Sequence, residues 1–308
     1  MSHPVQIFVA LGPVDEGTVV PLMGPNQKFI AHPNDDDLAR ANAAIVRAAY
    51  RIDGAVLDRM PELRVLARTG VGTDLVDVAE AERRGIPVVI TPGSNTSSVA
   101  EGVFTHLLSL VKRLSELTSI VRGGRWNERD KILVGDLEGR TLGIVGYGRI
   151  GRRVEQIALA FGLRVLAYDP FAEIPEQIRR TNIDDLVQES DFVTLHIPLT
   201  KETAGMFNSD RLALGRPGSI LINCSRGGLV DLDAALTALR SGQLGGLGLD
   251  VFDPEPPAHH PIFDHPRVCL SPHVMGFTQQ SMANTVRDAV LGAQAVLDGR
   301  RPLAEARA

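Results

Sequence analysis

Three side chains that follow apolar runs in the second half of the chain could together move a proton on a bound acid. They are Arg226 after the run 219–224, Glu255 after 246–252 and His273 after 268–270. A guanidinium can hold a carboxylate through two hydrogen bonds, and a carboxylate can orient an imidazole that donates or accepts a proton. Each residue alone is equally well explained as a surface residue at a strand end. The chemistry therefore requires that the three runs be strands of one sheet.

A glycine-rich segment indicates that a phosphate-containing ligand could bind beside such a site. Residues 146–151 are Gly-Tyr-Gly-Arg-Ile-Gly, and they come between the apolar run 142–145 and an amphipathic stretch. In a strand–turn–helix unit the first glycine turns the chain, the second lets the backbone approach a pyrophosphate, and the third lets the helix pack against the strand. The helix N-terminus then faces the phosphates. A tight turn without a ligand has the same pattern, so this motif needs a second, independent signal.

Asp169 supplies that second signal. It follows the run 164–168, at the distance where a carboxylate accepts hydrogen bonds from the ribose hydroxyls of a dinucleotide. Pro170 and Phe171 come next, so no adjacent arginine is present to bind a 2′-phosphate. A turn residue at a strand end is the alternative interpretation. Together the two motifs predict a site for NAD rather than NADP.

The elements that must position these residues are strands and helices in alternation. Short apolar runs alternate with amphipathic stretches from end to end, which predicts an α/β fold with doubly wound parallel sheets. In such a sheet the carboxyl ends of the strands share one edge, where ligands bind. We therefore expect Arg226, Glu255 and His273 to meet beside the dinucleotide. The predicted strands are residues 5–11, 43–46, 65–68, 87–91, 141–145, 164–168, 192–197, 219–224, 246–251 and 268–270.

Apolar residues at three- and four-residue spacing predict the helices. Residues 97–121 keep this spacing throughout and predict one long helix. A last amphipathic helix, residues 279–297, lies outside the strand series, and we expect it to return to the first domain. The other helices expected from the pattern are 35–40, 75–84, 149–161 and 232–240.

Length and composition limit the class of protein. The 308 residues suffice for about two domains. With 44% hydrophobic and 22% charged residues the chain is typical of globular proteins, and a net charge of −5 argues against nucleic acid as a partner. Cys224 and Cys269 both lie in apolar runs, so we expect neither a disulfide framework nor a metal site. Without a secretion signal or a membrane-spanning stretch, the protein is expected to be cytoplasmic, with no membrane partner.

Several blocks of this sequence resemble the NAD-dependent D-2-hydroxyacid dehydrogenases. The resemblance spans residues 43 to 290 approximately and implies two Rossmann-like domains. A cofactor domain, 98–277, would be inserted in a substrate domain made of 1–97 and 278–308. The similar blocks are 223–231, 250–256 and 271–276, which match the three active-site blocks in order, and 67–74 and 95–101, which match the substrate loop and the start of the interdomain helix.

The resemblance also implies an activity and the roles of individual residues. Hydride would pass between NAD(H) and a small D-2-hydroxy acid or 2-keto acid. Arg226 would bind the carboxylate and carbonyl of the substrate, His273 would act as acid or base, and Glu255 would pair with His273. The backbone amides of Val71 and Gly72 would form an anion nest for the same carboxylate. The residues expected at the cofactor are Ser98, Gly146, Gly148, Arg149, Ile150, Gly151, Asp169, Pro198, Cys224, Asp250, His273 and Gly276.

Two arginines in the first half predict a second anion site. Arg47 follows the run 43–46 and Arg68 follows 65–67, so parallel strands would place both near residues 70–72. A pair of guanidinium groups suits a phosphate, although solvated arginines at strand ends explain them equally well. Similar arginines occur in 3-phosphoglycerate dehydrogenases. Phosphohydroxypyruvate or 3-phosphoglycerate therefore ranks first as substrate, and hydroxypyruvate or glyoxylate second.

Departures from the family leave the substrate open, and two other functions use the same frame. Leu75 stands where asparagine is usual, and residues 48–50, Ala-Ala-Tyr, replace small hydroxyl residues. An NAD-sensing corepressor similar to the C-terminal-binding proteins would retain the same polar residues but would carry a long tail, which we do not expect here. A phosphite dehydrogenase would also keep them, whereas Glu255 argues against a formate dehydrogenase.

The resemblance further implies a homodimer formed through the NAD-binding domain, with Trp126 and the helix 97–121 as contacts.

Overall fold

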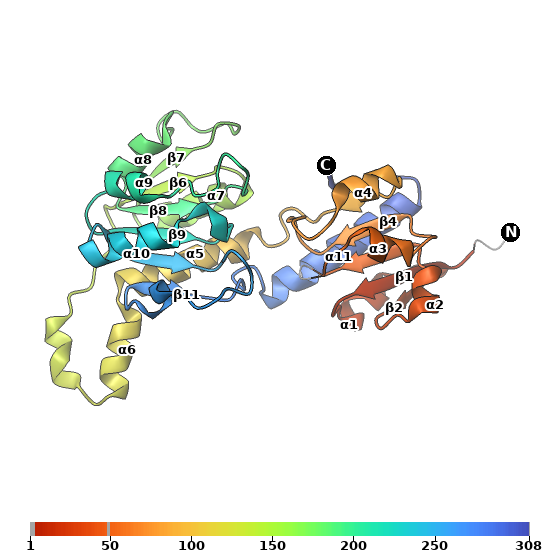
Figure 1. The fold of residues 1–308 in the computed structure, drawn as a ribbon, viewed down its shortest axis with the longest axis horizontal. Coiled ribbons are helices and arrows are strands. Elements are labelled where there is room, and N and C mark those ends of the chain that lie inside the picture. Colours follow the sequence, from red (N-terminus) through yellow and green to blue (C-terminus); the bar gives the residue numbers. More distant parts are fainter. Residues whose placement is uncertain (1–3, 48–49, 308) are drawn as a thin grey trace. The chain divides into compact units, whose positions relative to one another are not determined.

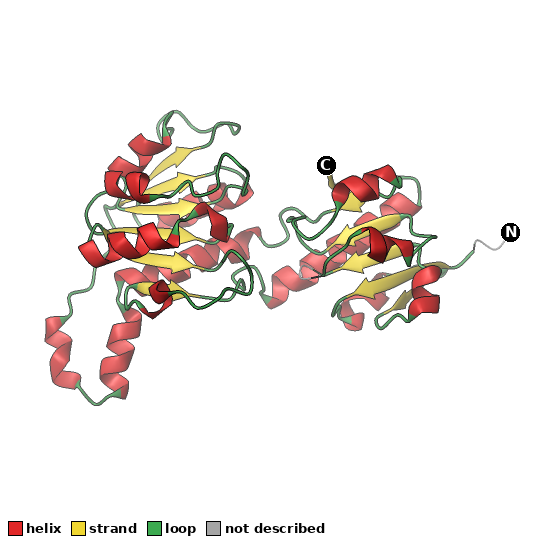
Figure 2. Ribbon diagram, viewed as in Figure 1, coloured by secondary structure: helices red, strands yellow, loops and turns green. Residues whose placement is uncertain are grey.

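The chain divides into two compact units. The structure, a computed structural model, describes residues 4–47 and 50–307. One unit comprises Met1–Asn95 with Phe277–Ala308, and the other comprises Thr96–Gly276. The sequence places these boundaries one or two residues later. In the described residues each unit is built on a six-stranded sheet with helices packed against it (Figures 1 and 2), as the α/β prediction requires. Ala48 and Ala49, which distinguish this chain from its expected family, lie outside the described residues.

The sheet of the second unit is entirely parallel, with the strand order β11-β10-β9-β8-β6-β7. Its strands are β6 (Thr141–Val145), β7 (Arg164–Tyr168), β8 (Phe192–Leu195), β9 (Ser219–Asn223), β10 (Leu244–Leu249) and β11 (Val268–Leu270). Each lies within two residues of its predicted position. Strand β10 begins two residues before its predicted start, which was hard to place because Gly245, Gly246 and Gly248 weaken the apolar signal. Its register with β9 shifts between Leu244 and Gly246.

Helices cover both faces of this sheet because alternate strand residues point to opposite faces. Ile220 and Ile222 of β9 pack in one core with α5 (Thr96–Val111) and α7 (Arg149–Ala160). Leu221, between them, packs in a second core with α8 (Ile183–Glu189), α9 (Ser209–Leu214) and α10 (Leu232–Ser241). Burial on both faces explains why the strands are almost continuously apolar.

The single long helix predicted for residues 97–121 is wrong, because two helices occupy this stretch. Helix α5 ends at Val111, and α6 (Leu114–Arg122) begins after Arg113, whose φ of 51° is left-handed. The break has a cause elsewhere in the chain. The Leu110 carbonyl accepts from Nη1 of Arg267 at 3.0 Å, and the Val111 carbonyl accepts from the Gly135 amide. The Arg113 amide bonds to the Leu110 carbonyl three residues earlier, so the i to i−4 ladder ends here, although the apolar spacing continues across the break.

The first unit has the strand order β12-β5-β4-β3-β1-β2, in which β12 alone is antiparallel to its neighbour. The predictions missed β2 and β12, because β2 reads Gln-Lys-Phe-Ile and β12 has only two residues. Neither carries an apolar run. The strands of this unit are β1 (Gln6–Leu11), β2 (Gln27–Ile30), β3 (Ala43–Val46), β4 (Val65–Arg68), β5 (Val88–Val89) and β12 (Glu305–Ala306).

The last long helix, α11 (Gln279–Leu297), packs on the sheet of the first unit. Val286, Ala289 and Val290 share a core with strand residues Ile45 and Ala67. A short element of the same unit begins after each of the capping residues Asp15, Asn34, Asp53 and Asp77, whose side chains accept amide hydrogens. These are α1 (Glu16–Val19), α2 (Asp35–Ala39), α3 (Gly54–Asp58) and α4 (Val78–Arg83). Of the helices in the described residues, none is long and apolar enough to cross a membrane.

Candidate active site

The glycine loop, residues 146–151, joins β6 to α7, and each of its glycines meets a different constraint. Gly146 has a φ of 97°, and a Cβ there would lie 2.5 Å from the carbonyl oxygen of His196. A Cβ on Gly151 would collide with the carbonyl oxygen of Gly146. At Gly148, by contrast, a Cβ would meet no heavy atom of the described residues within 4 Å. Open space beside the second glycine fits the approach of a pyrophosphate.

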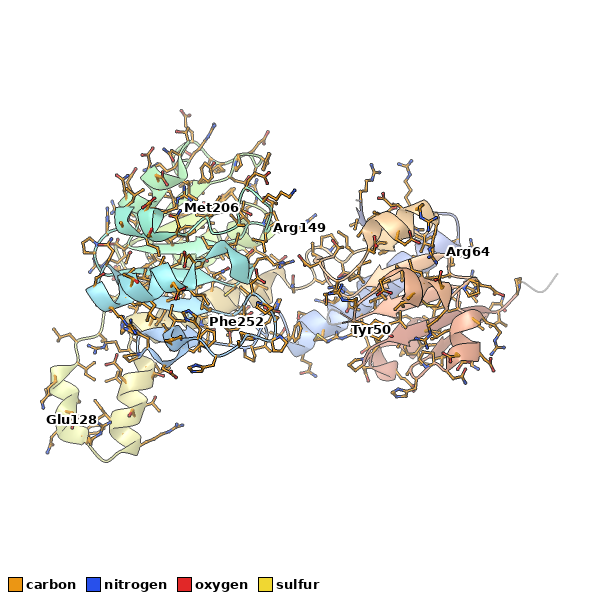
Figure 3. The ribbon with its side chains drawn as sticks, viewed as in Figure 1. Tyr50, Arg64, Glu128, Arg149, Met206 and Phe252 are labelled. Carbon is orange, nitrogen blue, oxygen red and sulfur yellow. The ribbon has the colours of Figure 1, made fainter. Side chains whose placement is uncertain are left out.

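The first turn of α7 has the properties of an anion site. Gly148 is the N-cap and offers no side-chain acceptor, so the amides of the first turn remain available to a ligand. Arg149 is exposed at this end of the helix (Figure 3), whereas Ile150 packs against the core. The helix dipole adds positive potential at the same point. The loop and helix therefore fit the diphosphate of a dinucleotide.

Tyr147, which the sequence analysis passed over, anchors the glycine loop to α7. Its ring is buried, and the Arg152 guanidinium lies 4.6 Å from the ring centroid. Its hydroxyl donates to Oε2 of Glu155. Burial, together with this hydrogen bond, raises the pKa of Tyr147 to about 12, so the phenol remains a donor at neutral pH. A buried tyrosine needs a polar partner, and a glutamate eight residues later supplies one.

Asp169 has a structural role that its position after β7 did not reveal. Its Oδ2 accepts the Tyr147 amide at 2.8 Å, and its Oδ1 accepts the amides of Phe171 and Ala172 at 2.8 and 3.1 Å. One carboxylate thus ties the glycine loop to the loop that follows β7. A carboxylate offers about four acceptor positions, so ribose hydroxyls can still bind to it. Asp169 both orders the binding loop and fits the predicted ribose contact.

Arg226 lies just beyond β9 on a loop that Asn223 holds. The fully buried Asn223 side chain accepts the Ser225 amide at 3.0 Å and donates to the Arg226 carbonyl at 2.8 Å. Nη1 of Arg226 donates to the Ser225 carbonyl, and the side chain is half-buried. Gly227, the next residue, has room for no Cβ because the backbone of Phe252 lies against it. The loops after β9 and β10 are therefore in close contact.

Glu255 and His273 form the hydrogen-bonded pair that the family resemblance implies. Nδ1 of His273 lies 2.8 Å from Oε2 of Glu255, and Oε1 of Glu255 accepts the Phe252 amide at 2.9 Å. Glu255 is thus fixed by its own loop while it orients the ring. The His273 side chain is 48% exposed, and its Nε2 has no hydrogen-bond partner in residues 4–47 and 50–307. Nε2 is the atom that can exchange a proton with a ligand.

The other residues expected at the cofactor lie along the carboxyl edge of the same sheet or on the helices that pack beside it. Pro198 follows β8, Cys224 follows β9 and Asp250 follows β10. Burial raises the pKa of the Cys224 thiol, which therefore stays neutral and does not act as a nucleophile. Ser98 lies in the first turn of α5, and Gly276 is the last residue of the second unit. Nothing in the structure assigns these residues a ligand, so their roles stay predictions.

In the first unit, Arg68 supports the loop 69–72. It is the last residue of β4 and is only 5% exposed. Its Nε donates to the Gly72 carbonyl, and its Nη1 donates to the Arg47 carbonyl at 3.2 Å. Val71 is exposed and Gly72 half-buried on the loop so formed. The guanidinium shapes the predicted anion nest through the backbone.

Arg47 lies just after β3, as predicted, but its surroundings are partly apolar. The guanidinium carbon is 5.9 Å from the ring centroid of Phe277, and Nη1 lies 3.5 Å from Sδ of Met282. Burial lowers the pKa of Arg47 from its usual value. The two arginines therefore differ: Arg68 is bound to backbone carbonyls, and Arg47 lies against the start of α11.

A family model described as "D-isomer specific 2-hydroxyacid dehydrogenase, NAD binding domain" matches residues 104–275. The D-3-phosphoglycerate dehydrogenase of Bacillus subtilis is 37% identical over 263 residues, which are 84% of this chain and 50% of that protein. The glyoxylate reductase of Thermococcus gammatolerans is 40% identical over 258 residues, 80% of this chain and 77% of the reductase. This chain thus spans about half the length of the phosphoglycerate dehydrogenases it matches.

Solved structures show the same fold. The TT0316 protein from Thermus thermophilus has a TM-score of 0.89 and 35% identity, over 97% of this chain and 99% of that one. A D-lactate dehydrogenase from Aquifex aeolicus, solved with NAD and lactic acid, has a TM-score of 0.80 and 29% identity over 96% of each chain. These likenesses extend over both units.

Asp169 accepts three backbone amides, so we expect its removal to weaken cofactor binding by more than the loss of a ribose contact alone. Asp169→Ala should raise the Kd for NADH at least tenfold, because it frees the glycine loop as well as the ribose, and should relax discrimination against NADPH. Fluorescence titration with each nucleotide measures both effects. Asp185→Ala, which removes an exposed charge in α8, is the control and should leave both constants unchanged. Equal affinity of the unmodified protein for NADPH and NADH would contradict the assignment.

Proposed function

Because the chain belongs to the D-isomer specific 2-hydroxyacid dehydrogenase family, whose NAD binding domain it contains, we propose that it interconverts a small 2-keto acid and the D-2-hydroxy acid. The observation that carries this proposal is the Glu255–His273 pair, in which Nε2 of His273 has no hydrogen-bond partner among the described residues. The pair lies after β10 and β11, and Arg226 follows the adjacent strand β9. Glycine loop, carboxylate, imidazole and guanidinium thus share one edge of a single sheet.

Arg226 binds the substrate in this mechanism. Its planar guanidinium suits the carboxylate of a 2-keto acid, which it can hold by two parallel hydrogen bonds. Asn223 and Ser225 fix the backbone of its loop, so little conformational freedom remains to be lost on binding. In the first unit, the amides of Val71 and Gly72, on the loop that Arg68 supports, are the proposed donors to an acidic group.

His273 moves the proton. NADH, when bound, supplies the hydride. Nε2 of protonated His273 donates to the carbonyl oxygen of the keto acid during reduction and takes the proton back during oxidation. Nδ1–H stays hydrogen-bonded to Glu255, whose negative charge stabilises the imidazolium and keeps the ring in place. Because the Phe252 amide holds the second oxygen of Glu255, the carboxylate cannot swing away from the ring.

We rank unphosphorylated acids such as glyoxylate and hydroxypyruvate above phosphohydroxypyruvate, which reverses the order that the sequence suggested. A phosphate site was expected from two guanidinium groups. The buried guanidinium of Arg68 bonds to the carbonyls of Gly72 and Arg47, which leaves Arg47 as the arginine of this pair that can reach a phosphate. Arg47 and the name of the Bacillus subtilis relative support phosphohydroxypyruvate as the second candidate. Neither the corepressor nor the phosphite enzyme is favoured, since the relatives are named as enzymes of organic acids, 3-phosphoglycerate and glyoxylate.

We also propose that two copies of the chain associate through the segment 114–134, here called the arm. It contains α6 and the 3₁₀ turn Trp126–Lys131, and it projects from the second unit (Figure 1; Figure 3 labels Glu128 in it). Apolar side chains are unusually exposed along it, among them Trp126 at 59% and Leu133 at 86%. Leu133 also lines a cavity of about 580 Å³ that extends to the start of β9. An exposed apolar patch of this kind on a folded unit indicates an interface.

The activity is tested by NADH consumption with glyoxylate, hydroxypyruvate and phosphohydroxypyruvate. The unmodified protein should turn over one or more of them, with the highest kcat/KM for an unphosphorylated acid. His273→Ala should lower kcat about 10²-fold or more, because it removes the general acid, while the Kd for NADH changes little. His259→Ala, which removes an exposed histidine of the second unit, should retain full activity and serves as the control.

Three outcomes would count against parts of this proposal. Turnover of none of the three acids would contradict the activity. A preference for phosphohydroxypyruvate would overturn the substrate ranking and leave the activity standing. Near-normal kcat in His273→Ala would remove this residue from the mechanism.

If the chain dimerises through the arm, one charged side chain placed in the arm should disrupt the dimer. Leu133→Asp should convert the protein from dimer to monomer in sedimentation velocity, because it buries a charge in an apolar interface. Phe171→Asp alters another strongly exposed apolar residue of the same unit, away from the arm, and should remain dimeric. A monomeric unmodified protein, or equal disruption by both substitutions, would exclude the arm as the contact.

A further inference from the structure

A chain of hydrogen bonds runs from the interior of α5 to the backbone beside His273. It begins at His106, which is 1% exposed. Nε2 of His106 lies 2.9 Å from Oγ of Ser271, and that hydroxyl donates to Oδ1 of Asp250 at 2.6 Å. All three residues lie in the second unit.

The chemistry of the groups fixes the direction of this chain. An ionised carboxylate only accepts, so the single hydroxyl hydrogen of Ser271 goes to Asp250. The Ser271 oxygen must then accept from His106, which places a hydrogen on Nε2. Nδ1 of His106 has no hydrogen-bond partner in the part of the chain that the structure describes. Burial lowers the pKa of His106, in agreement with a neutral ring that donates from Nε2 alone.

Asp250 passes this constraint to the residues that follow His273. It is 2% exposed, and it accepts the Val274 amide at 2.9 Å and the Met275 amide at 3.1 Å. His273 itself has a φ of 54°, a left-handed conformation that costs free energy in a residue other than glycine. Such a conformation persists only where its surroundings hold it. Asp250 holds the backbone directly after His273, and the backbone carbonyl of Ser271 accepts the His273 amide at 3.0 Å.

Helix α5 is packed tightly enough to serve as the fixed end of the chain. A Cβ on Gly248 of β10 would lie 2.8 Å from Cβ of His106, so only glycine allows this approach. A Cβ on Gly102, one turn earlier, would lie 2.5 Å from Cβ of Met275. Helix α5 is thus in close contact with strand β10 at His106 and with the loop after β11 at Gly102.

We propose that His106 is a positioning residue for His273, acting through Ser271 and Asp250. This inference rests on the proposed function, since it assigns His106 a part in the same proton transfer. Its Nε2–H fixes the rotation of the Ser271 hydroxyl, which keeps the Asp250 carboxylate in register with the two amides. The backbone of His273 thereby stays in the conformation that directs its ring toward Glu255. A histidine that only filled the core would affect stability and leave the catalytic loop unchanged.

The experiment compares three substitutions in α5. His106→Leu fills much of the volume without a donor, His106→Gln keeps an N–H at similar reach, and Phe104→Leu alters a buried residue of the same helix that stacks on Phe161. The readouts are hydrogen exchange at the Val274 and Met275 amides, which needs no substrate, and kcat for keto-acid reduction. His106→Leu should speed exchange at both amides at least tenfold and lower kcat about tenfold. His106→Gln should restore most of both, and Phe104→Leu should change neither.

The outcomes separate this inference from the proposed activity. Unchanged exchange and kcat in His106→Leu, or equal effects of His106→Leu and Phe104→Leu, would overturn the positioning role. If the unmodified protein reduces no keto acid, the proposed function fails, and exchange at the two amides still decides whether His106 holds the loop. Should His106→Leu not fold, Ser271→Ala interrupts the same chain one bond later. It must then give the same pattern, and normal exchange in that variant would also overturn the inference.

Discussion

Parallel pairing of β9 with β10 and of β10 with β11 brings the carboxyl ends of three neighbouring strands to one edge of a sheet. Arg226, Glu255 and His273 are separated by many residues along the chain, and each follows one of these strands. The glycine loop and Asp169 follow β6 and β7 at the same edge. Hydrogen bonding between strands therefore brings the candidate catalytic residues together, and burial of the sheet on both faces makes that arrangement rigid.

Carboxylates that bind backbone amides order the loops that leave this edge of the sheet. Asp169 holds three amides around the glycine loop, and Asp250 holds two beside His273. Hydrogen bonds to a charged acceptor contribute roughly 1.5–3 kcal/mol each, more than neutral ones. These contacts order the loops independently of a ligand. Glu255 does the same on a smaller scale, since it binds an amide of its own loop and the ring of His273.

The sequence predicted what depends on local pattern and missed what depends on distant contacts. Strands β6, β7 and β11 and helix α11 have the predicted bounds because apolar spacing and glycine stops define them. The break between α5 and α6 was not visible, because the carbonyls that end α5 are bound by Arg267 and Gly135. The amide contacts of Asp169, the backbone contacts of Arg68 and the partner of His106 likewise arise from packing. The only signal in the sequence for His106 was a histidine among the apolar positions of an amphipathic helix.

In the proposed mechanism, the Glu255–His273 pair delivers the proton at an edge where a dinucleotide binds. Single-turnover oxidation of enzyme-bound NADH by a 2-keto acid, compared between the unmodified protein and Glu255→Gln, tests it most directly. Glutamine keeps an acceptor for Nδ1–H but removes the charge that stabilises the imidazolium. The rate in Glu255→Gln should be at least tenfold lower, with the Kd for NADH unchanged. An unaltered single-turnover rate would contradict it and would leave Glu255 as a residue that only orders its loop.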